Sequence, residues 1–204
     1  MTYQIRDSLL LNNAEWHLEE CIGKGWFTPE DFGIDVAGAS STACYRGYCC
    51  AFNVIDNVLS LTKLQIHLDE SNLLPLNGVL PVKAKHFFDA NFPNSYQNIQ
   101  LPILFTGGFI IGQNGFKELP SSIGPELAWQ YENVRELIFD QGKLIEEHDC
   151  SNAIERIRQE IAATGGKVPL ENPSGNTRSD VYRQYDALKA RINSCFKLDY
   201  YHLR

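Results

Sequence analysis

The stretch CCAFNVIDNVLSLTKLQIHL (49–68) decides the fold, because two runs of alternating apolar residues flank a turn pair. Asp56-Asn57 is a dipeptide that tolerates positive φ in a two-residue hairpin turn. With that turn Phe52 faces Leu61, and directly opposed residues share one face of a sheet. The pattern predicts an antiparallel hairpin with one apolar face. The second face then carries the remaining side chains near the turn, Asn53, Ile55, Val58 and Ser60.

The alternation of apolar residues changes phase in the second arm of this hairpin. Apolar residues stand at Leu61 and then at Leu64, a shift of one position. Such a shift would turn core side chains to solvent unless a bulge absorbs it. We therefore expect a β-bulge near Thr62-Lys63. Beyond it, Leu64, Ile66 and Leu68 rejoin the apolar face, opposite Cys50, Tyr48 and Arg46 of a first arm that spans 43–55.

Hairpin signals dominate the chain up to about residue 147. Asn12-Asn13 and Gln141-Gly142 are turn pairs between short apolar runs. The segments 102–111 and 127–137 read as further strands. This pattern predicts a mainly β, α+β fold, an antiparallel β-sandwich or a partly open barrel with two C-terminal helices packed on it.

The apolar period changes from two to that of a helix after residue 147. Ile154, Ile157 and Ile161 follow the spacing of one helical face, and Asn152 with Glu155 resembles a capping box. A second helix begins near Asp180, with Tyr185, Leu188, Ile192 and Cys195 on one stripe. We expect a β body over 1–147 and a two-helix segment over 148–204, packed together as one domain.

Net charge and hydropathy limit the classes of protein to which this chain can belong. The 204 residues carry a net charge of −7, with −9 in 1–147 and +2 in 148–204. This balance argues against a nucleic-acid partner. It is compatible with an ordinary solvated acidic surface, with docking of the basic tail on the acidic body, and with a basic protein partner. No apolar run reaches the roughly 18 residues that span a bilayer. The start lacks the features of a signal peptide, so we expect a cytoplasmic protein without membrane contact.

Three cysteines, Cys44, Cys49 and Cys50, crowd into ten residues and raise the question of a metal site. In an extended strand Cys49 and Cys50 point to opposite faces, and Cys44 lies roughly 20 Å from Cys50. Two thiolates on one zinc ion lie within roughly 4 Å of each other. We therefore expect reduced, buried thiols, and no metal and no cofactor.

Arg46 is the first candidate for a ligand contact. On the apolar face beside Tyr48 it would need a carboxylate or a ligand anion, because an unpaired buried charge is strongly destabilising. A second bulge at Gly47 would instead rotate Arg46 to the surface. Pairing within the protein, exposure and anion binding all stay open.

A second candidate group comes from WQYENVRELIF (129–139), which places Trp129, Tyr131 and Arg135 on one face of a strand. An aromatic binding surface and an ordinary aromatic core are both compatible with that pattern.

The segments STACYRGYCCAFNVIDNVLSLTKL (41–64), GVLPV (78–82) and YENVRELIFDQGKL (131–144) together resemble an uncharacterised bacterial family. Its members are small cytosolic β-rich proteins with an RGY strand that runs into a tight hairpin, and some are encoded near toxin or effector genes. The resemblance excludes the C-terminal helices. It implies a non-catalytic role and brings no catalytic residues.

Three hypotheses for function follow. The leading one is a non-enzymatic protein-binding module, of the immunity or adaptor type, that uses an acidic β surface. The second is a protein with a pocket for a small anionic ligand near Arg46. The third is a cryptic hydrolase that uses a thiol, such as Cys44 or Cys50 with His67, or an Asp/Glu/His cluster.

Overall fold

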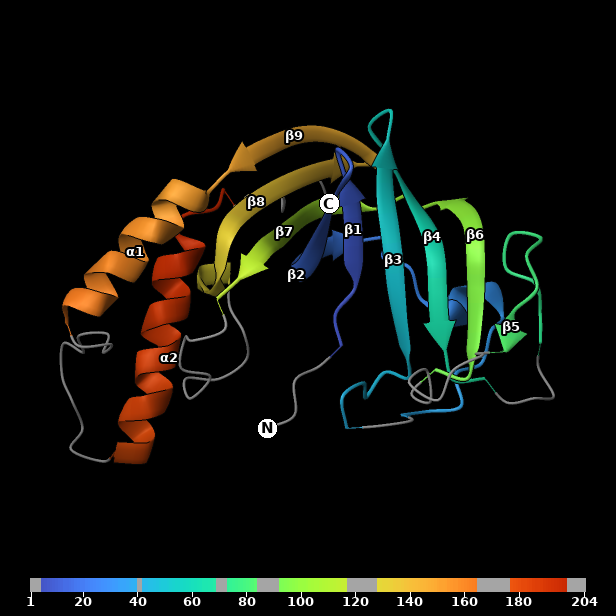
Figure 1. The fold of residues 1–204 in the computed structure, drawn as a ribbon, viewed down its shortest axis with the longest axis horizontal. Helices are drawn as coiled ribbons and strands as arrows, with labels where there is room; N and C mark the ends of the chain where they lie inside the picture. The colour runs from blue at the N-terminus through green and yellow to red at the C-terminus, as the bar shows by residue number, and fades with distance from the viewer. Residues whose placement is uncertain are drawn as a thin grey trace.

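The computed structural model describes residues 5–39, 42–68, 73–83, 92–116, 128–164 and 177–197. These residues form a barrel with two helices at one side (Figure 1). The strands are β1 (Ser8–Leu11), β2 (Ala14–Lys24), β3 (Tyr48–Ile55), β4 (Val58–Ile66), β5 (Val82–Lys83), β6 (Asn94–Pro102), β7 (Thr106–Gly115), β8 (Tyr131–Asp140) and β9 (Lys143–Asp149). The helices are α1 (Ser151–Ala163) and α2 (Thr177–Asn193), with short 3-10 turns η1 (Pro29–Phe32) and η4 (Ala128–Gln130).

Seven of the strands close into a barrel in the order β3-β1-β2-β7-β8-β9-β4, with β4 pairing again with β3. Strands β6 and β5 extend the sheet outward from β4. The mainly β fold with two C-terminal helices is confirmed, and the barrel is closed. Strand β1 runs parallel to β3, with Leu9 opposite Phe52. The expectation of a wholly antiparallel sheet is wrong at this pair, because β1 inserts between β2 and β3.

The predicted hairpin turns are confirmed by their backbone angles. Asn12 and Asn13 have φ of 51° and 62°, and Asp56 and Asn57 have φ of 50° and 63°. The turn at Gln141-Gly142 has the same form. Positive φ at both central residues gives the turn the twist of the strands it joins. Asparagine, aspartate and glycine tolerate this conformation best, which is why these dipeptides were informative.

The predicted bulge lies at Thr62. Ala51 pairs with Lys63 and Phe52 with Leu61, so Thr62 has no opposite residue. Its hydroxyl donates a hydrogen bond to the Ala51 carbonyl oxygen at 2.9 Å. The extra residue restores the alternation, and Leu61 and Leu64 are both fully buried on the same side.

Aromatic side chains fill the inside of the barrel. The rings of Trp26 and Phe52 lie 4.7 Å apart between centroids, and those of Phe105 and Phe109 lie 4.7 Å apart. Phe139 lies 4.9 Å from Phe109. Such rings contribute large apolar areas to a core. The candidate binding surfaces therefore lie on the outside of the barrel or at gaps in its wall.

The two helices pack on the outer face of the curved β7–β8–β9 part of the sheet (Figure 1). Val134 of β8 belongs to a second core with Ile154 and Ile157 of α1 and Leu188 of α2. The predicted helical stripes are thus confirmed. The capping box at Asn152 is wrong, because α1 begins at Ser151, whose backbone N–H donates to the Asp149 carboxylate at 2.9 Å.

Several strand boundaries differ from expectation. The first arm begins at Tyr48 rather than at residue 43, because the chain turns over residues 42–47. Strand β8 begins at Tyr131, and Trp129 lies in η4 before it. In strand β6, three residues between Gln97 and Leu101 lie opposite the single residue Thr62 of β4, and Ile99 among them is buried. Neither helix in the described ranges combines the length and the apolarity required to cross a membrane.

Candidate functional site

Arg46 lies in the turn before β3 and is bound by Asp7. Its Nη1 donates to Asp7 Oδ2 at 2.9 Å, and its Nη2 donates to Asp7 Oδ1. Its Nε donates to the Tyr48 carbonyl oxygen at 2.8 Å, and its guanidinium carbon lies 4.7 Å from the Tyr48 ring centroid. Burial lowers the pKa of Arg46, but the Asp7 carboxylate outweighs it and the net pKa is raised. Arg46 is therefore held as a cation by an internal carboxylate.

The Asp7 carboxylate also accepts the backbone N–H of Cys50 at 2.6 Å. Its side chain is 4% exposed, whereas that of Arg46 is 35% exposed. One carboxylate thus ties the segment before β1, the turn before β3 and β3 itself together. A carboxylate that accepts hydrogen bonds from several donors is held strongly, because each of these bonds is charge-assisted.

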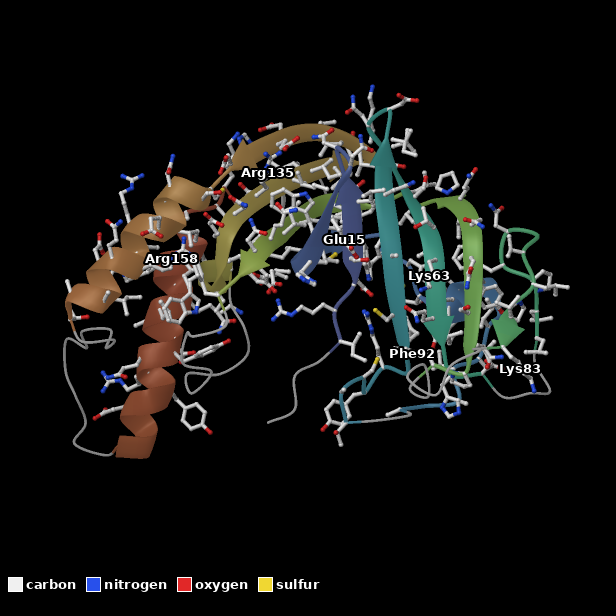
Figure 2. All side chains as sticks on the ribbon, viewed as in Figure 1. Glu15, Lys63, Lys83, Phe92, Arg135 and Arg158 are labelled. Atoms are coloured by element: carbon white, nitrogen blue, oxygen red, sulfur yellow. The ribbon has the colours of Figure 1, made fainter. Side chains whose placement is uncertain are left out.

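The cysteine geometry differs from the predicted strand. Cys44 lies in the turn, where its Sγ donates to the Tyr48 carbonyl oxygen at 3.2 Å, and it packs with Cys49 and Phe92. The prediction of Cys44 within the same extended strand as Cys50 is wrong, because β3 begins only at Tyr48 and the chain turns at Gly47 with φ of 75°. Figure 2 labels Phe92, which lies near the base of β3.

All six cysteines are free thiols. Burial, followed by the nearby Asp7 carboxylate, raises the pKa of Cys49 from 9.0 to about 12 and the pKa of Cys50 well above 9.0. A thiol with a raised pKa is a poor nucleophile and a poor metal ligand at neutral pH. Among the residues that the structure describes, no three His, Cys, Asp or Glu side chains are grouped to hold a metal ion.

Trp129 and Tyr131 belong to the core between the barrel and the helices. Both side chains are buried. Arg158 of α1 donates to the Trp129 carbonyl oxygen at 2.9 Å and to the Tyr131 carbonyl oxygen (Figure 2 labels Arg158). The Tyr131 ring lies over Gly112, where a Cβ atom would meet it at 2.5 Å. These contacts join α1 to η4 and β8.

Arg135 of β8, labelled in Figure 2, makes a different set of contacts. Its guanidinium carbon lies 5.1 Å from the Trp16 ring centroid, and it forms an ion pair with Glu147. Trp129 precedes the strand and therefore shares no strand face with Tyr131 and Arg135. The five predicted residues form three separate groups: Arg46 with Tyr48, Trp129 with Tyr131, and Arg135 alone.

The sequence did not predict the surroundings of Arg46, a pocket of about 390 Å³ between β2, the segment before β1 and the 44–46 turn. We call it the Arg46 pocket. Glu19 is the extra residue of a bulge in β2, between Leu18 and Glu20. Its side chain is 3% exposed and pairs with Arg6. The residues around this pocket include Arg6, Asp7, Glu19, Glu20, Cys21, Trp26 and Arg46. The break in the alternation of β2 at Glu19-Glu20 was the one local signal for this pocket.

A second surface lies at the other end of β3, where the β3–β4 turn meets the start of β9 (Figure 1). Ile55 and Val58 are directly opposed, and the Leu144 N–H donates to the Asn57 carbonyl oxygen at 2.7 Å. Four aliphatic side chains are exposed there and form what we call the tip patch: Ile55 at 61%, Val58 at 42%, Leu104 at 66% and Ile145 at 47%. Ile55 is seven positions along an extended strand from Tyr48, about 23 Å.

Comparison with known proteins assigns no function to the Arg46 pocket or to the tip patch. No protein-family model matches this chain, and no curated protein or solved structure matches it.

Proposed function

We propose that this protein is a non-enzymatic protein-binding module, of the immunity or adaptor type, and that the tip patch is the centre of its interaction surface. The observation that carries the proposal is the exposure of four aliphatic side chains on three segments that meet at this end of the barrel: the β3–β4 turn, the β6–β7 connection and the start of β9. Contiguous apolar groups at a surface are characteristic of protein interfaces. These side chains project away from the aromatic interior, so the barrel core does not require them.

The charge around the tip patch indicates the chemistry of the partner. Asp56 lies in the turn between Ile55 and Val58, and Asp140 is exposed next to Lys143, its partner residue across the β8–β9 hairpin. The whole chain has a net charge of −7. An apolar centre with a mainly acidic rim complements a basic protein that offers apolar side chains. The resemblance to small proteins encoded near toxin or effector genes is compatible with such a partner.

The anionic-ligand alternative near Arg46 loses its main support. The donors of Arg46 are directed to Asp7 and to the Tyr48 carbonyl oxygen. The two guanidinium groups at the Arg46 pocket, those of Arg46 and Arg6, are paired with the carboxylates of Asp7 and Glu19. A free anion would have to compete with Asp7 for Arg46.

The thiol-hydrolase alternative is not favoured either. A nucleophilic cysteine is activated by a lowered pKa, usually beside an imidazole or another cation. Burial raises the pKa of Cys50 well above 9.0. The surroundings of this thiol thus act against activation.

The experiment is native mass spectrometry of the full chain, purified gently from its own host, with the double variant Ile55→Ser/Leu104→Ser alongside. Leu80→Ser is the matched control, because Leu80 is 63% exposed and lies elsewhere, before β5. We expect a basic protein to accompany the wild type and the control and to be absent from the double variant. A partner that stays bound to the double variant, or a homodimer in its place, contradicts the proposal.

A further inference from the structure

The inner face of the barrel changes from apolar to polar toward the end of β7 and the start of β8. Phe109 is opposite Leu137, and both side chains are fully buried in the barrel core. Four residues further along each strand, Gln113 is opposite Asn133. Directly opposed residues, and every second residue along a strand, share one face of a sheet. Gln113 and Asn133 therefore lie on the same inner face as the two apolar side chains.

The polar row continues across β8 and β9. Arg135 is two positions from Asn133 and is opposite Asp149. The guanidinium group of Arg135 is paired with Glu147. Hydrogen bonding by Ser151, with a smaller contribution from Arg135, holds the pKa of Asp149 below its ordinary value. The row thus offers neutral amides and an ionised acceptor, while its guanidinium group already has a counter-charge.

These side chains border a pocket of about 310 Å³ between the β1–β2 turn and the start of α1, which we call the Trp16 pocket. Leu11 and Trp16 belong to the barrel core and form the apolar part of its lining. The volume lies at the lower end of the range of small-ligand sites, which suits a molecule of one ring. The residues around the pocket are Leu11, Asn12, Ala14, Trp16, Gln113, Asn133, Arg135, Asp149 and Ser151.

Trp16 is an independent sign that this pocket is incomplete. The residue is 5% exposed, and its Nε1 is buried without a hydrogen-bond partner among the described residues. A buried N–H without an acceptor is destabilising, and buried indole N–H groups usually have a partner. The guanidinium carbon of Arg135 lies 5.1 Å from the ring centroid, but a guanidinium group cannot accept a hydrogen bond. An oxygen atom of a bound molecule would supply the missing acceptor.

The mixture of donors and acceptors indicates the class of ligand. The side-chain amide of Asn133 both donates and accepts, and it forms no hydrogen bond to the residues that the structure describes. Hydroxyl groups also donate and accept, so they match the amides, the Asp149 carboxylate and the indole N–H together. A charged ligand would be repelled either by Asp149 or by Arg135. The carbon atoms of a sugar ring can pack against Leu11 and Ala14.

We infer that the Trp16 pocket binds one neutral sugar ring, with an oxygen that accepts from Trp16 Nε1 and with hydroxyl groups bound to Asn133 and Gln113. Asp149 accepts from a further hydroxyl group. The sugar is either a free monosaccharide or the terminal residue of a glycan. The pocket shares no residue with the tip patch, so this inference stands or fails independently of the proposed function.

The test is a two-dimensional NMR titration of the full chain, followed at the indole N–H of Trp16, which the Trp16→Phe variant identifies. The probes are D-glucose, D-galactose, D-mannose and N-acetyl-D-glucosamine, and ethylene glycol is the control that offers hydroxyl groups without a ring. We expect a saturable downfield shift of the indole proton with at least one sugar and none with ethylene glycol. The methyl glycoside of that sugar distinguishes the two sources: binding of the glycoside indicates a glycan terminus, and binding of the free sugar alone indicates a monosaccharide.

Variants locate the site. Loss of one neutral hydrogen-bonding group in Asn133→Ala is expected to weaken binding about fivefold. Asn152→Ala removes the same amide from an exposed position on α1 outside the pocket and leaves affinity unchanged. Gln113→Ala provides a second test inside the pocket. The inference is overturned by the absence of a saturable indole shift with all four sugars, by an equal shift with ethylene glycol, or by unchanged affinity in both Asn133→Ala and Gln113→Ala.

Discussion

Arg46 and Asp7, 39 positions apart in the chain, form a two-bond ion pair in which the carboxylate is almost completely buried. Asp7 also accepts the Cys50 N–H. Arg46, which the sequence suggested as an anion-binding residue, is thus paired with a carboxylate of the protein itself. The same pair forms one wall of the Arg46 pocket.

Replacement of Asp7 by asparagine should destabilise the fold markedly. The change leaves Arg46 without a counter-charge, and partial exposure of the guanidinium group moderates the loss, so we expect about 2 kcal/mol in the free energy of unfolding. Urea denaturation measures it. The more exposed Arg135–Glu147 pair is the comparison, and Glu147→Gln should lose at most about 1 kcal/mol. Equal losses in the two variants would show that Asp7 does not have this role.

Stability should fall on the alkaline side because of the buried thiols. The pKa of Cys49 is about 12 in the folded protein against an ordinary 9.0. The stabilisation is therefore fully present below pH 9 and is lost as the pH rises toward 12, with a slope of about 1.4 kcal/mol per pH unit for one thiol. Urea midpoints at pH 8, 9 and 10 measure the slope. Cys49→Ser should reduce the loss of unfolding free energy per pH unit by the contribution of one thiol. An unchanged slope in this variant argues against burial of Cys49.

Arg158→Met should loosen the contact between α1 and the barrel. The side chain is 10% exposed and donates to the carbonyl oxygens of Trp129 and Tyr131. Two buried acceptors lose their donor, so we expect a loss of about 2 kcal/mol in unfolding free energy and faster amide exchange in α1. Arg156→Met, at an exposed position on the same helix, is the control and should change stability by about 0.5 kcal/mol at most.

Gly112→Ala tests the position of Tyr131. A Cβ at Gly112 would meet the Tyr131 ring at 2.5 Å, whereas one at Gly115 would lie 3.5 Å from the same ring. We expect Gly112→Ala to cost about 1–3 kcal/mol through overpacking. Gly115→Ala should be close to neutral, within about 1 kcal/mol. Thermal unfolding compares the two, and similar melting temperatures would place the Tyr131 ring elsewhere.

Local patterns in the sequence were sufficient for the hairpins and for the bulge at Thr62. Turn dipeptides such as Asp56-Asn57 and the phase shift after Leu61 each depend on neighbouring residues. The same alternation placed Ile55 and Val58 away from the core face. It did not show that Leu104 and Ile145 join them, because those residues come from distant segments.

Contacts between residues far apart in the chain could not be predicted from the sequence. The parallel β1–β3 pair and the Arg46–Asp7 pair each join residues about 40 positions apart without a local signal. The turn at Gly47 also interrupted a segment that reads as a continuous strand, which changed the positions of Cys44 and Arg46. The residues predicted to form one site therefore lie in three different places, although each of them makes a specific contact.

The central claim is that the tip patch binds a basic partner, and the most direct test is the dissociation constant of the accompanying protein, measured by calorimetry for the wild type and for Ile55→Ser/Leu104→Ser. Removal of two apolar contacts from the centre of an interface should weaken binding by about tenfold or more. Leu80→Ser should bind as the wild type does, and higher salt should weaken the wild-type complex. An unchanged dissociation constant in the double variant would contradict the account.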